Sequence, residues 1–296
     1  MPIRILGPHV HRNLAVFTLH ERGGERGGFL SLDEALASGL VKVTERAQQD
    51  VRRLQIENRS RSRIFLQEGD RLQGGLQDRT VQTTVVVPAS SKARALDTFC
   101  IEQSRWSGGR AFTATATGAL APRSVRAAAK VAGDQCRVWE QVAKAKEDAT
   151  RRLKARSTTS SLNELLEDPQ VLKASGYFVD ELASILRGTR DVVGFAFAVN
   201  GRVEEADIYA TPALARKLYR KLLATYALEA VLRAGEDEAP LAVPDVERFL
   251  ATRGGRGRTR AIDDRNELTI VELADRVACT TAYRKRVVHR QVLLKA

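Results

Sequence analysis

The stretch VVGFAFAVNGRVEEADIY, residues 192–209, carries the clearest folding information in this chain of 296 residues. Its first half is almost wholly apolar, its second half is partly polar, and the Asn200-Gly201 pair between them is typical of a type I′ turn. Thr211-Pro212 then supplies a helix N-cap and a proline at the first helical position. We therefore predict a β-hairpin that leads into a long helix over Ala213–Arg233.

The first third of the chain has the composition of a β-rich region. Five runs combine β-branched or aromatic residues with partial alternation, and glycine, aspartate or serine separates them. Ser31 and Glu34 form a capping-box pattern, which predicts one short helix that ends near Gly39. The predicted strands are Val10–His20, Val51–Arg59, Ser62–Glu68, Arg79–Val87 and Leu96–Glu102.

The segment from Pro122 to about residue 190 changes to a helical pattern. Ser161 and Glu164 form a second capping box, which opens a short helix that Pro169 limits. A further helix is expected through Asp180–Leu186. Before these, apolar residues recur at three- and four-residue steps, at Val138, Val142, Ala145, Ala149 and Leu153.

The C-terminal part completes the predicted fold. A Gly- and Arg-rich segment over residues 253–260 is typical of a flexible basic loop, and closing strands are expected over Leu268–Leu273 and Arg286–Leu294. We predict a single α+β domain whose mixed or antiparallel, barrel-like sheet is flanked by helices. Its three parts are a β-rich part (1–121), a helical part (122–190) and the hairpin–helix unit with the closing strands (191–296).

Charge and composition bound the classes of partner. The formal net charge is +12 and the sequence pI is about 10.0, so the surface attracts anions such as nucleotides, phosphates and nucleic acid. Because a high arginine content also follows genome base composition, an ordinary basic surface is the alternative interpretation. No apolar run approaches the roughly 18–20 residues of a membrane helix, and the N-terminus lacks the pattern of an export signal. We expect a cytoplasmic protein with no membrane partner.

Cysteine and histidine usage argues against structural metal sites. Cys100, Cys136 and Cys279 are widely spaced and form no CxxC pair, and the four histidines show no metal-ligand spacing. We therefore expect reduced thiols, no disulfide framework and no metal site.

Polar chemistry is densest in the stretches EGDRLQGGLQDR, residues 68–79, and FCIEQSRW, residues 99–106. Strand parity places Glu68 and Arg79 at the ends of apolar faces, where a charge needs a partner, so we expect them to meet each other, the backbone or a ligand. Cys100 shares a face with Glu102. A structural Glu–Arg network and a ligand site both fit this pattern.

Two features of these stretches suit an anion or a covalent reaction. Gly74-Gly75 can present backbone N–H groups to an anion that Arg79 also binds, or it can simply form a tight turn. Cys100 is a nucleophile if Arg105 or another cation lowers its pKa, and is otherwise a buried, inert thiol.

The two tryptophans, Trp106 and Trp139, are further candidates for ligand contact. An indole ring can stack on a nucleobase, although large aromatic side chains more often pack in the core. Both interpretations stay open for each residue.

The most specific motifs are Glu68-Gly69, Gly74-Gly75-x-Gln77-x-Arg79, Cys100-x-Glu102 and Arg105-Trp106, and they are followed later by Val193-Gly194, Asn200-Gly201 and Asp207. Together they resemble the ADP-ribosylglycohydrolase and rhodanese-phosphatase-associated protein family, and the resemblance spans roughly residues 5–295. It implies a stand-alone, bacterial-type α+β domain that is associated with NAD and ADP-ribose metabolism.

From the residues and this resemblance we predict binding or processing of a small, ADP-ribose- or nucleotide-like anion. In this hypothesis the arginines bind phosphate, the glutamine orients the ligand, and a glutamate acts as general acid or base. The catalytic candidates are Glu68, Glu102 and Cys100, and the ligand-binding candidates are Gly74, Gly75, Gln77, Arg79, Arg105 and Trp106. The alternative is a noncatalytic nucleic-acid- or protein-interaction module that uses the basic segment 253–260. Catalysis, cofactor and oligomeric state stay open.

Overall fold

The computed structural model describes residues 3–21, 28–46, 52–106, 109–235, 240–252 and 254–295. The chain forms two compact units. Unit 1 comprises Met1–Gly28 and Gly176–Ala296, and unit 2 comprises Phe29–Ser175. Within the described ranges, no helix combines the length and the apolar character that crossing a membrane requires.

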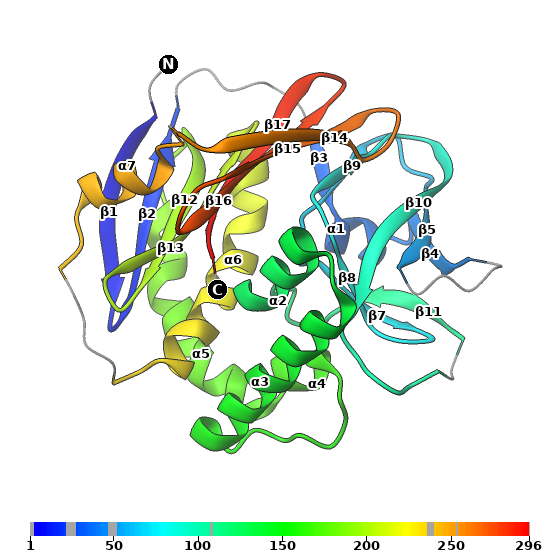
Figure 1. The fold of residues 1–296 in the computed structure, drawn as a ribbon, viewed down its shortest axis with the longest axis horizontal. Coiled ribbons are helices and arrows are strands. Elements are labelled where there is room, and N and C mark those ends of the chain that lie inside the picture. Colours follow the sequence, from blue (N-terminus) through cyan, green and yellow to red (C-terminus); the bar gives the residue numbers. More distant parts are fainter. Residues whose placement is uncertain are drawn as a thin grey trace. The chain divides into compact units, whose positions relative to one another are not determined.

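Unit 1 is built on an eight-stranded antiparallel sheet (Figure 1). The predicted hairpin is confirmed, with Asn200 and Gly201 at positive φ angles of 51° and 73°, as a type I′ turn requires. The strand order is β1 (Arg4–His11), β2 (Leu14–His20), β12 (Val192–Val199), β13 (Arg202–Tyr209), β17 (Arg286–Leu294), β16 (Arg276–Tyr283), β15 (Asn266–Glu272) and β14 (Arg256–Ala261).

Helices cover both faces of this sheet. The predicted long helix is α6 (Pro212–Leu232), and Thr211 caps it by accepting a hydrogen bond from the backbone N–H of Leu214 at 3.1 Å. Its Tyr219 and Tyr226 pack on Phe195 and Phe197 of β12, with ring centroids 4.6 and 4.7 Å apart. On the opposite face lies a core cluster that includes residues of α7 (Val243–Leu250). α5 (Pro169–Leu182) begins in the last residues of unit 2 and ends in unit 1, where a 3₁₀-helix (Ala183–Leu186) follows it.

Unit 2 contains two smaller sheets. Strand β4 also lies beside β11, so the larger, antiparallel sheet nearly closes into a barrel. The order of this sheet is β11 (Arg110–Ala114), β7 (Arg71–Gly75), β8 (Arg79–Val81), β10 (Ser91–Cys100), β5 (Arg53–Asn58) and β4 (Val41–Glu45). The smaller, mixed sheet consists of β3 (Phe29–Ser31), β6 (Arg63–Leu66) and β9 (Val85–Val87). The predicted α+β class with a barrel-like sheet is confirmed.

Three helices in the described part of unit 2 begin at capping side chains, which are Ser31, Asp134 and Ser161. The capping box of Ser31 and Glu34 is present at α1 (Leu32–Ala37). The later helices are α2 (Arg123–Ala127), a π-helix (Ala128–Ala132), α3 (Gln135–Leu153) and α4 (Leu162–Leu166). On α3, Val138, Val142 and Ala149 are buried, as the periodicity predicts.

Three predictions about strands and loops are wrong. Val10–His20 is not one strand, because the chain reverses at Arg12 (φ 50°) between β1 and β2. Arg79–Val87 is not one strand either, because it bends after Val81, so β8 and β9 belong to different sheets. Residues 256–260 of the predicted basic loop belong to β14 (Arg256–Ala261), which pairs with β15. Arg253 lies outside the described residues.

Candidate functional site

The turn between β7 and β8 has a backbone shape that needs glycine. Gly74 and Gly75 have φ angles of +120° and +56°, and a Cβ atom on Gly75 would lie 2.2 Å from the Phe112 ring. The backbone N–H of Gly74 donates to Asp78 Oδ1 at 2.9 Å. The N–H group that the sequence offers to an anion is therefore already bound within the protein.

Asp78 connects this turn to α4. Its Oδ2 accepts hydrogen bonds from Ser161 Oγ at 2.7 Å and from Asn163 Nδ2 at 2.9 Å. The amide oxygen of Asn163 in turn accepts a hydrogen bond from the Arg71 guanidinium. Burial lowers the pKa of Arg71 to about 10, so this arginine stays charged at neutral pH. A charged and fully hydrogen-bonded frame thus fixes Asp78.

Glu102 and Arg105 form the second part of the site, just beyond the end of β10. Arg105 Nε donates to Glu102 Oε1 and Oε2 at 2.8 and 2.9 Å, and the backbone N–H of Asp78 donates to Glu102 Oε2 at 3.1 Å. Arg105 also donates to the carbonyl oxygens of Gly75 at 3.0 Å and Gly74 at 3.3 Å. The hydrogen bond to Glu102 raises the pKa of Arg105 above its usual range. The pair therefore closes the turn, with Glu102 buried and Arg105 partly exposed to solvent.

These residues line a cavity of about 860 Å³, which we call the acidic pocket. Among its described lining residues, four are carboxylates and Arg105 alone is a cation. Such a lining offers many hydrogen-bond acceptors and little positive charge. The lining residues are Gln73, Gly74, Asp78, Glu102, Arg105, Ala111, Thr113, Thr159, Ser161, Asn163, Glu164 and Glu167.

Glu164 has a different role from the one that its capping-box position predicts. Ser161 does cap α4, by accepting from the backbone N–H of Asn163 at 3.1 Å. Glu164 instead accepts from Lys146 Nζ at 2.6 Å and from the backbone N–H groups of Thr158 and Thr159. Burial acts to raise the pKa of Glu164, but these hydrogen bonds together lower it to about 2. Glu164 is an ionised acceptor at any physiological pH.

Three of the predicted site residues lie inside the barrel-like sheet, and none of them lines the acidic pocket. Arg79 is 1% exposed, and its Nη1 donates to Gln77 Oε1 at 3.1 Å and to Cys100 Sγ at 2.6 Å. Its Nη2 lies 3.6 Å from Glu45 Oε1. Burial raises the pKa of the Cys100 thiol to about 11, so this thiol is protonated at neutral pH.

Glu68 and Trp106 also lie apart from the pocket lining. Glu68 is fully buried, accepts from Arg126 Nη1 at 3.4 Å and forms an ion pair with Lys130. It therefore meets cations of the helical segment and not Arg79. Trp106 directly follows Arg105 and is 50% exposed, so it is not a core residue. The structure thus brings Gly74, Glu102 and Arg105 together from the predicted set.

Comparison with protein families matches residues 2–293 to the model of the ARG and Rhodanese-Phosphatase-superfamily-associated Protein domain, ARPP-1. The chain belongs to the ARPP-1 family. A search of curated proteins and a search of solved structures found no match.

Several lining residues of this ARPP-1 protein were not predicted as site residues. Asp78 lies inside the stretch 68–79, between two residues that were singled out, and Glu164 belongs to a recognised capping box. For both residues, the neighbouring sequence indicates a structural or functional role. Asn163 and Glu167 carry none, because their place in the pocket depends on α4 lying against the β7–β8 turn.

The lining of the ARPP-1 pocket supplies hydrogen-bond acceptors and carboxylates that can transfer protons. Across the part of the chain that the structure describes, no group of three or more His, Cys, Asp or Glu side chains is arranged to bind a metal ion. Carboxylates that are already bound to N–H donors keep further lone pairs for a ligand's hydroxyl groups. The arrangement therefore suits a ligand that is rich in hydroxyl groups.

Proposed function

We propose that unit 2 binds an ADP-ribose-type ligand, with a ribosyl group in the acidic pocket. The observation that carries this proposal is the lining of four carboxylates and one arginine around a cavity of about 860 Å³. Ligand pockets commonly have volumes of about 300–1,000 Å³ and a few convergent polar groups. A ribosyl group supplies the hydroxyl donors that this lining can accept.

The charge of the lining decides which part of the ligand enters. Four carboxylates repel a phosphate group, and Coulomb repulsion is strongest where water is excluded. Arg105 is the cation at this site, and its side chain is 32% exposed. In the proposal the ribosyl hydroxyls contact the carboxylates, and the diphosphate lies at the rim beside Arg105.

The family supports this assignment. ARPP-1 is described by its association with ARG and the rhodanese-phosphatase superfamily, and we take ARG to stand for ADP-ribosylglycohydrolase. A protein that works beside enzymes of ADP-ribose metabolism has a reason to bind their substrates or products. The family description therefore supports the proposed class of ligand, which is an ADP-ribose-type molecule.

Glu102 is the residue that we propose for an acid–base role if the ligand is processed. It lines the acidic pocket, whereas Glu68 and the protonated thiol of Cys100 do not. Chromatography of NAD and ADP-ribose after incubation with the protein tests this role. We expect the wild type to form product and Glu102→Gln to form none. Equal product from the wild type and the variant would contradict the acid–base role of Glu102.

Calorimetric titration tests the binding proposal. We expect ADP-ribose to bind and inorganic pyrophosphate alone to give no heat above that of dilution. Arg105→Ala should weaken ADP-ribose binding tenfold or more, because it removes the cation of the pocket. The matched control is Arg59→Ala, since Arg59 forms the same two-bond pair with Glu57 on the surface, at 3.1 Å for each bond. Equal affinities of the two variants would refute the proposal.

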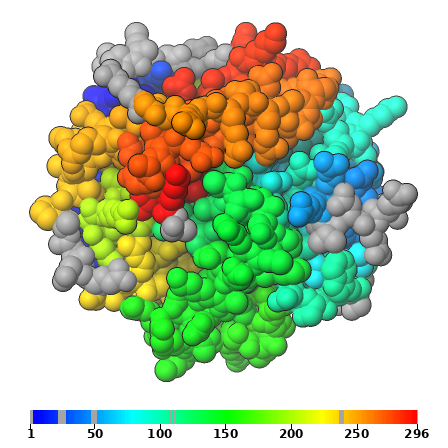
Figure 2. Space-filling model, viewed as in Figure 1, coloured from blue at the N-terminus to red at the C-terminus, as the bar shows by residue number. Residues whose placement is uncertain are grey.

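One observation favours a second candidate function, nucleic-acid binding by unit 1. Every residue of the edge strand β14 is exposed, and Arg256, Arg258 and Arg260 alternate along it. Figure 2 shows β14 and β15 in orange on the visible surface. Residues two apart on a strand lie about 6.6–6.8 Å from each other on one side, a spacing that suits successive phosphates.

Salt dependence tests this candidate. If β14 neutralises phosphates, log Kd for single-stranded RNA should change linearly with log salt concentration, and replacing the three arginines by serine should reduce the slope by about 2. Replacing three exposed basic residues of unit 2, Arg53, Arg59 and Lys92, is the control. An unchanged slope in the β14 variant would exclude this surface.

A further inference from the structure

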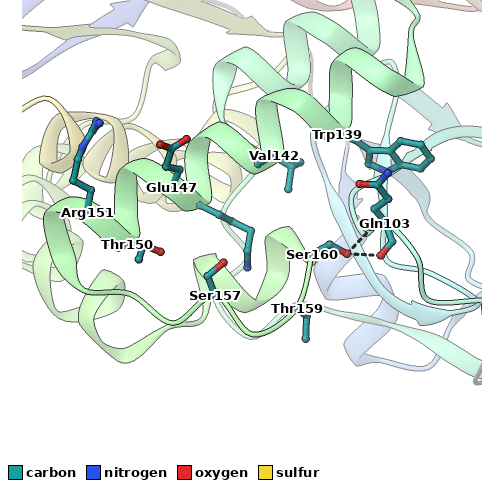
Figure 3. Close-up of a pocket in the computed structure, with 11 residues that line it drawn as sticks. Gln103, Trp139, Val142, Glu147, Thr150, Arg151, Ser157, Thr159 and Ser160 are labelled. Atoms are coloured by element: carbon teal, nitrogen blue, oxygen red, sulfur yellow. Dashed lines mark hydrogen bonds between the residues drawn. The ribbon is translucent and has the colours of Figure 1, made fainter.

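A second cavity of unit 2, of about 480 Å³, lies between α3 and the chain segment 157–160 (Figure 3). We call it the tryptophan pocket. Figure 3 shows Trp139 and Gln103 at one end and Glu147, Thr150 and Arg151 at the other. The lining residues are Gln103, Trp139, Val142, Ala143, Lys146, Glu147, Thr150, Arg151, Ser157, Thr159 and Ser160.

The end of this pocket at Trp139 combines an aromatic ring with an unused donor. Within the described structure the indole Nε1–H of Trp139 is buried and has no hydrogen-bond acceptor. A buried N–H group without an acceptor destabilises the protein, and a ligand that brings an acceptor would recover that loss. Val142 and Ala143, which follow on the same helix, supply apolar surface, and Gln103 supplies a side-chain amide. These groups suit a flat ring with acceptor atoms on its edge.

The cations of this pocket are already engaged. Lys146 Nζ donates to Glu164 Oε2 at 2.6 Å and to the carbonyl oxygen of Ser161 at 3.1 Å. Arg151 forms an ion pair with Asp148 one turn earlier on α3. A phosphate group would have to break one of these pairs, whereas a neutral ring would not. The charges therefore favour an uncharged heteroaromatic ring as the occupant.

The two pockets of unit 2 share a wall. Thr159 lines both of them, and Gln103 of the tryptophan pocket directly follows Glu102 of the acidic pocket. Ser160 accepts a hydrogen bond from the backbone N–H of Gln103 at 2.9 Å, so the segment 157–161 is fastened between the two cavities. A ligand with two linked parts can place one part in each.

We infer that the tryptophan pocket is the nucleobase subsite for the ligand of the acidic pocket, and that the base is a purine. This inference rests on the proposed function, because it assigns the second half of the same ligand. A purine has ring nitrogens that accept from the in-plane Trp139 N–H, and its flat faces can pack against the apolar surface of Val142 and Ala143. Its exocyclic group lies within the reach of an amide such as that of Gln103.

The two tryptophans of the chain make the subsite measurable. In the variant Trp106→Phe, Trp139 is the remaining tryptophan and its fluorescence reports on this pocket. We expect adenosine to quench that fluorescence saturably and ribose 5-phosphate to leave it unchanged. In Trp139→Phe, which loses the N–H donor and keeps an aromatic ring, ADP-ribose binding should weaken about tenfold relative to Trp106→Phe. Ribose 5-phosphate affinity should be equal in the two variants.

The outcomes separate this inference from the proposed function. If ADP-ribose binds both variants equally and adenosine does not quench Trp139, the base subsite is refuted and the ribosyl site stands. If adenosine quenches Trp139 while ADP-ribose gives no binding heat, the proposed function is refuted and the purine subsite is supported. Equal weakening of ribose 5-phosphate and ADP-ribose by Trp139→Phe would show a general disturbance of unit 2 and would also refute the subsite.

Discussion

Two glutamates of unit 2, which the sequence offers as equivalent acid–base candidates, end in different environments. Glu68 pairs with Arg126 and Lys130, and all three side chains are at most 1% exposed. Glu102 pairs with Arg105, whose side chain is 32% exposed, and both line the acidic pocket. The same kind of ion pair therefore lies in the interior in one case and in the lining of the acidic pocket in the other.

Access to water separates the two pairs. Charges in the interior have lost their hydration, so each depends on its partner and cannot exchange it for a ligand. A partly exposed pair costs little to rearrange, because water replaces a lost contact. The exposed fraction of the cation, more than the residue types, therefore distinguishes the buried structural pair from the pair that lines the acidic pocket.

The largest effect should come from breaking the buried pair. Glu68→Gln leaves the charges of Arg126 and Lys130 uncompensated, and we expect it to lower the free energy of unfolding by about 3–5 kcal/mol. Urea unfolding followed by circular dichroism measures this change. The matched variant is Glu102→Gln, for which we expect a smaller loss of about 2 kcal/mol, because the Glu102 side chain is 8% exposed but water reaches its partner Arg105. Similar losses of stability in the two variants would show that the Glu102–Arg105 pair is as structural as the Glu68 pair.

The second-largest effect concerns the reactivity of the buried thiol of Cys100. Because burial raises the pKa of Cys100 to about 11, its thiolate is scarce at pH 8. Iodoacetamide should therefore modify Cys100 about a hundredfold more slowly than an ordinary thiol. Peptide mass spectrometry measures the rate, and the exposed Cys136 of the same chain is the internal control. Comparable rates at the two cysteines would show that Arg79 and Cys100 are open to solvent.

A smaller loss of stability is expected when the partly exposed Arg105 is replaced. Arg105→Ala removes a partly exposed guanidinium, and water can replace its contacts with the carbonyl oxygens of Gly74 and Gly75. We expect a loss of about 1–2 kcal/mol in the free energy of unfolding, with a much larger proportional effect on ligand affinity. Thermal unfolding with and without ADP-ribose measures both. A loss of stability as great as that of Glu68→Gln would place Arg105 among the structural residues.

Local patterns in the sequence were sufficient for elements whose signals lie within a few residues. The β12–β13 hairpin follows from Asn200-Gly201, and α6 follows from Thr211-Pro212. The failures arose where one pattern spans two elements or where a strand has no hydrophobic residues to mark it. Arg12 has no glycine beside it to mark the reversal between β1 and β2, and the fully exposed β14 has the sequence RGRTRA, which shows no hydrophobic alternation.

The site was predictable in part for the same reason. Gly74, Glu102 and Arg105 lie near one another because β7, β8 and β10 are neighbours in one sheet. Arg79 also lies in that sheet, but it is paired with Cys100 of β10, so its side chain lies beside Cys100 on the buried face. Asn163 binds Asp78 across a long stretch of sequence, and no local pattern encodes that contact. The local sequence thus predicts three residues of the pocket, Gly74, Glu102 and Arg105, but does not distinguish them from the candidates that lie elsewhere.

The smallest effect tests an intermediate case, Glu164, whose side chain is 19% exposed and which lines the acidic pocket. Its pKa in the folded protein is about 2, below the ordinary value of 4.5, so its stabilising contribution is complete above about pH 4.5 and is lost as the pH falls toward 2. Glu164→Gln should therefore be less stable than the wild type at pH 7, and the difference should shrink between pH 4.5 and pH 2.5. Urea unfolding at pH 7, 4.5, 3.5 and 2.5 measures it. Glu140→Gln, at an exposed position on the neighbouring α3, is the control. A difference that does not vary with pH would mean that Glu164 belongs with the exposed pairs, where water already satisfies the carboxylate.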